Sequence, residues 1–290
     1  MEKEKTKTDY KVLKKDYSAL KMQYFAEKHQ IKMQARRDLE TLKDEYTINR
    51  LTLKKPLKAK KYRLKVQKKI EHRRLNRPPE RKVIEEIGNS VTHGVGAIIA
   101  FVCLILMINK ASTGTALFAS IVYGVCFVCQ MLFSCLYHAF ANGTKVKAVF
   151  RRFDYSTIYL QIGGTFAPIY LVYMNDVMWG YPSGLIFFLV QWALIALGIT
   201  FVGVFGPGRI RWLHYTLYFV LGWSGILFLP SFITHDLPLL FFILGGGLFY
   251  TLGMIPFSVL KEKKTAHFIW HFFVLFGAII QWLGIYLYVL

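Results

Sequence analysis

Residues 115–139 read TALFASIVYGVCFVCQMLFSCLYHA and contain no lysine, arginine, aspartate or glutamate. An apolar run of this length crosses a hydrocarbon core of about 30 Å as a helix. The strands of a membrane barrel are shorter and alternate apolar with polar residues, which this run does not do. Six further runs follow the same pattern, at 94–109, 155–175, 183–205, 212–233, 237–260 and 267–290. The sequence therefore predicts an all-α, polytopic membrane protein with a bundle of seven transmembrane helices.

The charges divide the chain into two parts. Of 290 residues 54% are hydrophobic, yet the net charge is +20, and one uniform globular domain does not combine the two. Residues 1–80 hold 25 basic and 11 acidic residues, whereas the other 210 hold 12 and 6. We therefore expect a basic tail over 1–80 and a membrane domain over 81–290. The charged tail has no apolar core segment of the kind that a cleavable signal peptide needs.

The loop charges predict the orientation of the helices. The loops 141–153, 206–211 and 261–264 carry nine lysines and arginines, whereas the alternating loops 110–114, 176–182 and 234–236 carry Lys110 alone. By the positive-inside rule, the tail and the three basic loops are cytoplasmic and the C-terminus is outside. We expect the chain to reside in the cell's plasma membrane with this orientation.

The tail has two segments with different expected partners. Apolar residues recur at steps of three and four within 10–46, at Tyr10, Leu13, Tyr17, Leu20 and Tyr24 and again at Leu39, Leu42 and Tyr46. This spacing predicts a helix or short coiled coil that self-associates or binds a partner. Residues 51–80 hold 12 basic and 2 acidic residues beside the membrane, which favours binding to anionic lipid headgroups. No nucleic-acid recognition motif accompanies them, so nucleic acid is not an expected partner.

Four ionisable residues lie at the ends of the apolar runs. His138 closes the run 115–139, Asp154 precedes the run 155–175, and His267 and His271 open the last run. Ionisable groups are costly inside a membrane bundle and commonly mark functional sites. The loop orientation places all four at the cytoplasmic side, so three helices bring them to one depth.

The spacing of these residues predicts a zinc site. His267 and His271 are four residues apart and share one helical face, and His138 would complete a three-histidine site with an open fourth position. Asp154 could orient or deprotonate a zinc-bound water, or fill that position itself. Ser134 shares a face with His138 and could donate a hydrogen bond to a developing oxyanion. Taken singly, each of these residues is better read as structural, because histidines at helix ends often reach to water. Taken together, their placement at one side in three helices favours a metal site.

The same motifs resemble a known family. The chain is similar to the bacterial haemolysin III proteins, which belong with the progestin and adipoQ receptors and, more distantly, the alkaline ceramidases. The resemblance covers about residues 81–290 and rests on Glu86-x-x-Asn89-x-x-Thr92-His93, Ser134-x-x-x-His138, Arg152-Phe-Asp154-Tyr-Ser156, Gly164-Thr-Phe-Ala-Pro168, Gly247-Leu-Phe-Tyr-Thr-Leu-Gly253 and His267-x-x-x-His271.

The resemblance implies a function as well as a fold. It implies seven helices with a cytosolic N-terminus, zinc held by His138, His267 and His271, and Asp154 holding the metal-bound water. We expect first a zinc-dependent hydrolase that acts on a lipid amide or ester in membrane lipid homeostasis, because an open three-histidine site lies at the depth of lipid linkages. A non-enzymatic membrane sensor with structural zinc and a pore-forming cytolysin are the alternatives.

Overall fold

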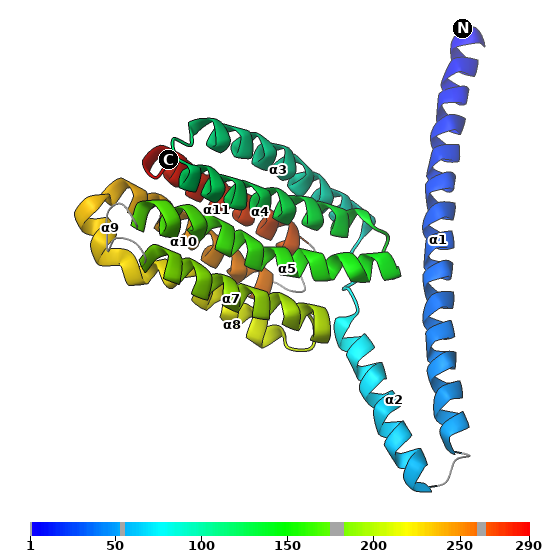
Figure 1. Ribbon diagram of the computed structural model, residues 1–290. Helices are drawn as coiled ribbons and strands as arrows, with labels where there is room; N and C mark the ends of the chain where they lie inside the picture. Colours follow the sequence, from blue (N-terminus) through cyan, green and yellow to red (C-terminus); the bar gives the residue numbers. More distant parts are fainter. Residues whose placement is uncertain (1, 53–55, 175–182, 260–264) are drawn as a thin grey trace. The chain divides into compact units, whose positions relative to one another are not determined.

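The computed structural model describes residues 2–52, 56–174, 183–259 and 265–290 (Figure 1). Within these ranges every regular element is a helix and there is no strand. The all-α class predicted from the sequence is therefore confirmed. The chain divides into two compact units, residues 1–74 and 75–290.

The first unit is built of long polar helices. α1 is a single helix over Glu2–Thr52, and α2 covers Pro56–Asn76. Proline is suited to the first turn of α2, because the amide hydrogen that it lacks has no partner at that position. The helix predicted over residues 10–46 lies within α1, and its apolar residues Leu13, Tyr17, Leu20 and Tyr24 are exposed. The self-association predicted for this segment stays a prediction.

The second unit is a bundle of helices. In chain order they are α3 (Val83–Lys110), α4 (Gly114–Ala139), α5 (Lys145–Pro168) continued by the π-helix η1 (Ile169–Tyr173), α7 (Ser183–Phe205), α8 (Arg211–Gly222), the 3₁₀-helix η2 (Ser224–Phe228), α9 (Leu229–His235), α10 (Leu237–Val259) and α11 (Ala266–Tyr288). Neighbours in the chain pack together from α3 to α7, α10 packs on α11, and α11 returns to α3 (Figure 1). The bundle thus encloses an interior that several helices line.

Six segments of the described chain are long and apolar enough to cross a membrane. They are Val83–Lys110, Gly114–Ala139, Ser183–Phe205, Arg211–His235, Leu237–Ile255 and Ala266–Tyr288. The seventh predicted span, 155–175, lies in α5 and η1 up to Met174, and residue 175 is outside the described residues. α5 is less apolar because charged residues fill its first turns and polar residues such as Gln161 and Thr165 follow. The seventh span stays a prediction.

Two predicted helix boundaries were wrong. The run 94–109 belongs to a helix that begins at Val83. Glu86 and His93 interrupt the apolar pattern of the sequence before residue 94, but in the structure both are helical and buried inside the bundle. The run 212–233 is divided into α8, η2 and α9 instead of forming one helix. Pro230 stands at the start of α9 and has no amide hydrogen to continue an α-helical ladder from η2.

Glycines bring the helices of the bundle close together at two contacts. A Cβ atom added to Gly164 on α5 would lie 2.6 Å from the Cβ of Cys126 on α4. A Cβ added to Gly246 on α10 would lie 2.7 Å from the carbonyl oxygen of Gly277 on α11. No side chain fits at either position, so these contacts set the spacing of helices that line the interior.

Candidate metal centre

Three imidazoles from two helices that are far apart in the sequence lie close together inside the bundle. His138 lies in the last turn of α4, and His267 and His271 lie in the first two turns of α11. The Nε2 atom of His267 is 3.2 Å from the Nε2 atoms of both His138 and His271. His138 and His271 are buried, and His267 is partly buried. The structure therefore brings together all three residues predicted as metal ligands.

The geometry of the three nitrogens fits a metal ion. A tetrahedral ion with metal–nitrogen distances of 2.0–2.1 Å holds its ligand nitrogens about 3.3–3.4 Å apart. Two of the three separations, from His267 to His138 and to His271, are 3.2 Å and close to that value, and all three ligand atoms lie within 4.8 Å of one another. Lone pairs of neutral imidazoles that face one another repel, and a bound cation removes this repulsion. The cluster can thus hold one metal ion, and imidazole donors suit zinc, copper, iron or nickel.

A carboxylate and an ammonium group orient His138. The Oε2 atom of Glu86 on α3 accepts a hydrogen bond of 2.6 Å from Nδ1 of His138, which leaves Nε2 with its lone pair facing the other imidazoles. The other oxygen of Glu86 lies 3.1 Å from the Nζ atom of Lys147 on α5. Lys147 also donates to the carbonyl oxygens of Tyr137 and Phe140, at 3.0 Å each. This buried chain of contacts links α3, α4 and α5 beside His138.

A fourth imidazole packs against the cluster. The ring of His93 on α3 stacks on the ring of His271, with centroids 3.8 Å apart and planes inclined by 20°. His93 is buried and lines the same cavity as His267 and His271. It limits the rotation of the His271 ring and so helps to aim its Nε2 atom.

The other two predicted site residues face the same cavity. A pocket of about 180 Å³ extends from the cluster into the bundle, and its lining includes Asp154, Ser134, His267 and His271. Ser134 is buried beside Asp154, close enough to interact with its carboxylate. A carboxylate and a hydroxyl therefore lie at the end of the pocket where the three imidazoles meet.

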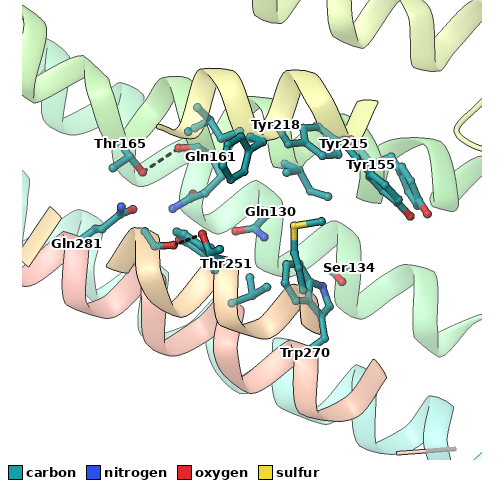
Figure 2. A pocket seen from close by; sticks show the side chains of 18 of the residues that line it. Gln130, Ser134, Tyr155, Gln161, Thr165, Tyr215, Tyr218, Thr251, Trp270 and Gln281 are labelled. Atoms are coloured by element: carbon teal, nitrogen blue, oxygen red, sulfur yellow. Dashed lines mark hydrogen bonds between the residues drawn. The ribbon is translucent and has the colours of Figure 1, made fainter. Parts of the chain in front are cut away.

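The pocket continues away from the cluster between α5, α8, α10 and α11. Figure 2 shows Ser134, Trp270 and Tyr155 towards one end of it and Gln161, Thr165 and Gln281 towards the other, with Gln130 between them. The pocket wall between these two ends is mainly apolar and includes Ile158, Ile162, Met254 and Val274. We call the part around His267 and His271 the metal end, and the part around Gln161, Thr165 and Gln281 the inner end.

Sequence reasoning did not assign a role to Glu86, Lys147 or His93 in the site. Glu86 and His93 belong to the motif Glu86-x-x-Asn89-x-x-Thr92-His93 ahead of the first predicted span, but nothing in the sequence links that motif to His138 and His271. Lys147 was counted among the cytoplasmic loop charges, whereas its side chain is fully buried and paired with Glu86. Arg151, counted in the same way, is also buried and donates to the carbonyl oxygens of Asn76 and Arg77.

Comparisons with known proteins agree with these motifs. The sequence model of the family described as Haemolysin-III related matches residues 81–282. The chain is 35% identical to Hemolysin-3 of Bacillus cereus over 215 residues, which cover 72% of this chain and 93% of the relative. It is 32% identical to the Hemolysin-3 homolog of Bacillus subtilis (strain 168) over 201 residues, which cover 67% and 89%. The chain belongs to the haemolysin III family.

Proposed function

We propose that the chain is a zinc-dependent hydrolase that cleaves an amide or ester bond of a membrane lipid. The observation that carries this proposal is the convergence of three imidazole Nε2 atoms at one end of a mainly apolar pocket that also holds Asp154 and Ser134. A ligand set, an acid–base group and an apolar surface for the lipid are what lipid hydrolysis requires.

Zinc is the metal that suits this donor set and this reaction. His138, His267 and His271 would hold it, and three protein ligands leave a position open for catalysis. When bound, zinc supplies a Lewis acid that lowers the pKa of a coordinated water to about 7. The second contact of His138, to Glu86, is the kind of carboxylate support that zinc-binding histidines commonly have.

The side chains around the ligands support a division of roles. The carboxylate of Asp154 faces the pocket and would accept a proton from the attacking water, then pass it to the departing amine or alcohol. The products would be a fatty acid and that amine or alcohol. The hydroxyl of Ser134 would donate a hydrogen bond to Asp154 or to the carbonyl oxygen as negative charge develops on it.

The membrane setting completes the proposal. We infer seven spans, with α5 and η1 as the third, an N-terminus in the cytoplasm and a site that opens near the cytoplasmic surface of the plasma membrane. The basic residues of the tail would bind anionic headgroups there, since each lysine or arginine near such a surface contributes about 1 kcal/mol. Residues 10–46 would provide self-association. The role of such an enzyme would be the turnover of membrane lipids.

The proposal is tested by measuring metal and hydrolysis together. The purified full-length protein should contain about one zinc per chain and release fatty acid from a long-chain N-acyl amide in mixed micelles. The His271→Ala variant should lose both the zinc and the hydrolysis. His214→Ala is a matched control, because His214 is equally buried and bonds to Tyr159 away from the cluster, at 2.9 Å.

Two results would decide between this function and a sensor with structural zinc. A folded wild type without zinc removes the hydrolase proposal. A wild type that binds zinc, melts at a lower temperature when the metal is stripped and hydrolyses neither amides nor esters supports a bracing role for the ion. Release of dye from liposomes by the wild type would instead support the cytolytic activity that the names of the two Bacillus relatives describe.

A further inference from the structure

We propose that the inner end of the pocket is a subsite for a hydroxyl group carried by the acyl chain of the lipid. This inference rests on the proposed function, because it takes the pocket to hold an acyl chain. The polar side chains that line the pocket beyond its metal end include Gln161 and Thr165 on α5, Gln281 on α11, and Gln130 on α4. All four are buried, with at most 7% of each residue exposed.

Several of these polar groups lack a hydrogen bond of normal length. Neither the Nε2 nor the Oε1 atom of Gln161 makes one within the part of the chain that the structure describes, and the same holds for Oε1 of Gln130. The phenol of Tyr250 is close enough to interact with Gln161, but it too has no hydrogen bond of normal length among the described residues. A buried amide without partners is costly, and more so within a membrane. These groups are therefore suited to a partner that enters the pocket.

The distance from the metal end is that of a group well along an acyl chain. Gln281 follows His271 by ten residues on α11, which is about 15 Å of helix, and Gln161 follows Asp154 by seven residues on α5, which is about 10 Å. Between them the pocket is lined by apolar side chains such as Ile158, Ile162 and Val274. A lipid with its scissile bond at the metal end would pass an apolar stretch before reaching the glutamines.

The chemistry of the inner end selects a neutral group. The carboxylate and imidazole side chains among the described pocket residues, Asp154, His93, His267 and His271, all belong to the metal end. A charged group at the inner end would have no counter-charge and would be disfavoured in a low-dielectric site. The amide of glutamine both donates and accepts hydrogen bonds, and a hydroxyl group does the same. A hydroxylated acyl chain matches both properties.

The test compares two fatty acids that differ in one hydroxyl group. Ricinoleic acid and oleic acid share the same chain and double bond, and ricinoleic acid carries a hydroxyl beyond that bond. Binding of each to the full-length protein in detergent is measured by displacement of a fluorescent fatty acid. A net gain of one hydrogen bond predicts that ricinoleic acid binds about five- to tenfold more tightly. In Gln161→Leu this preference should fall below about twofold while oleic acid still binds.

The control is a glutamine that is equally buried and outside the pocket lining. Gln191 on α7 donates to Ser224 Oγ at 3.2 Å, so Gln191→Leu should keep the preference. Gln281→Leu provides a second variant if Gln161→Leu fails to fold. Loss of the preference in a folded pocket variant, with the control unchanged, supports the subsite. Equal affinities in the wild type, or a preference that both pocket variants keep, overturns it and means that the glutamines bind water alone.

Binding also separates this proposal from the one on which it rests. Fatty acid displacement needs no catalysis, so a preference for ricinoleic acid together with absent hydrolysis would overturn the hydrolase and leave the subsite. Hydrolysis without any preference for the hydroxyl would overturn the subsite and leave the hydrolase.

Discussion

Two sets of buried polar side chains, the chain Lys147–Glu86–His138 at the metal end of the pocket and the amide of Gln161 at the inner end, differ in how they are paired. At the metal end, Lys147 pairs with Glu86, and Glu86 accepts a hydrogen bond from His138, whose Nε2 atom faces the other imidazoles. At the inner end, both amide atoms of Gln161 lack a hydrogen bond within the described chain. Both ends are enclosed by the same helices, α5 and α11, so the difference lies in the side chains and not in their depth of burial.

The imidazole of His138 is held in one orientation by its partners, whereas the amide of Gln161 is available to hydrogen-bond a ligand. The paired chain from Lys147 through Glu86 to His138 fixes the orientation of one imidazole, whereas Nδ1 of His271 and both ring nitrogens of His93 have no hydrogen bond among the described residues. An unpaired neutral group costs stability but leaves its hydrogen bonds available to a ligand. The metal end should therefore respond strongly to the loss of one partner, and the inner end weakly.

The largest effect is expected for Asp154→Asn. The amide cannot accept a proton as the carboxylate does, so hydrolysis should fall by about 10²- to 10⁴-fold, the usual contribution of a general acid–base group. The zinc content should stay at about one per chain, because the three imidazoles remain. Metal analysis and turnover on an N-acyl amide, measured on one preparation, check both parts.

Asp236→Asn is the matched control for that substitution. Asp236 accepts a hydrogen bond from the backbone of Leu239 at the start of α10, and asparagine can do the same. Its turnover should be unchanged. If Asp154→Asn instead loses its zinc, Asp154 is a ligand in the fourth position, and the pocket has no separate acid–base group at its metal end.

A smaller effect is expected for Glu86→Gln, which breaks the chain of contacts behind His138. Loss of such a supporting carboxylate typically weakens metal binding by about 10- to 100-fold. The substitution also leaves the ammonium of Lys147 buried without its counter-charge, which should reduce the free energy of unfolding by about 3–5 kcal/mol. Competition with a zinc chelator measures the first effect, and thermal unfolding in detergent the second.

Glu85→Gln is the control on the same helix, since Glu85 precedes Glu86 and is less buried. The double variant with Glu86→Gln and Lys147→Met should recover much of the lost stability but not the zinc affinity. Unchanged zinc affinity in Glu86→Gln would show that the metal end does not depend on its paired network.

The sequence predicted the helices and the pairing of His267 with His271 because both leave a local pattern. Long apolar runs predict membrane helices, and the four-residue spacing of His267 and His271 predicts that both lie on one helical face. The burial of Lys147 and its pairing with Glu86 could not be predicted in the same way. Its place in a basic segment is typical of a loop at the membrane surface, and its burial depends on Glu86, which lies 61 residues earlier and is brought near by the packing of α3, α4 and α5.

The inner end escaped prediction for a related reason. A glutamine within an apolar run is commonly read as an interruption, and Gln130, Gln161 and Gln281 stand in three separate runs. Their meeting in one pocket is a property of the folded bundle. The polar character of α5, which is less apolar than the six candidate spans, is explained in part by the residues that it turns towards this pocket.

The smallest effect is expected for Gln161→Leu in the absence of lipid, and it is the sharpest test of the comparison. Because the amide makes no hydrogen bond of normal length among the described residues, leucine removes little more than the contact with Tyr250 and adds apolar surface. The free energy of unfolding should stay within about 1 kcal/mol of the wild type or rise. Gln191→Leu, which loses the bond to Ser224, should instead be destabilised by about 1–3 kcal/mol. A loss in Gln161→Leu as large as that in Gln191→Leu would mean that water already pairs the inner amide, and its contrast with the paired chain Lys147–Glu86–His138 would then disappear.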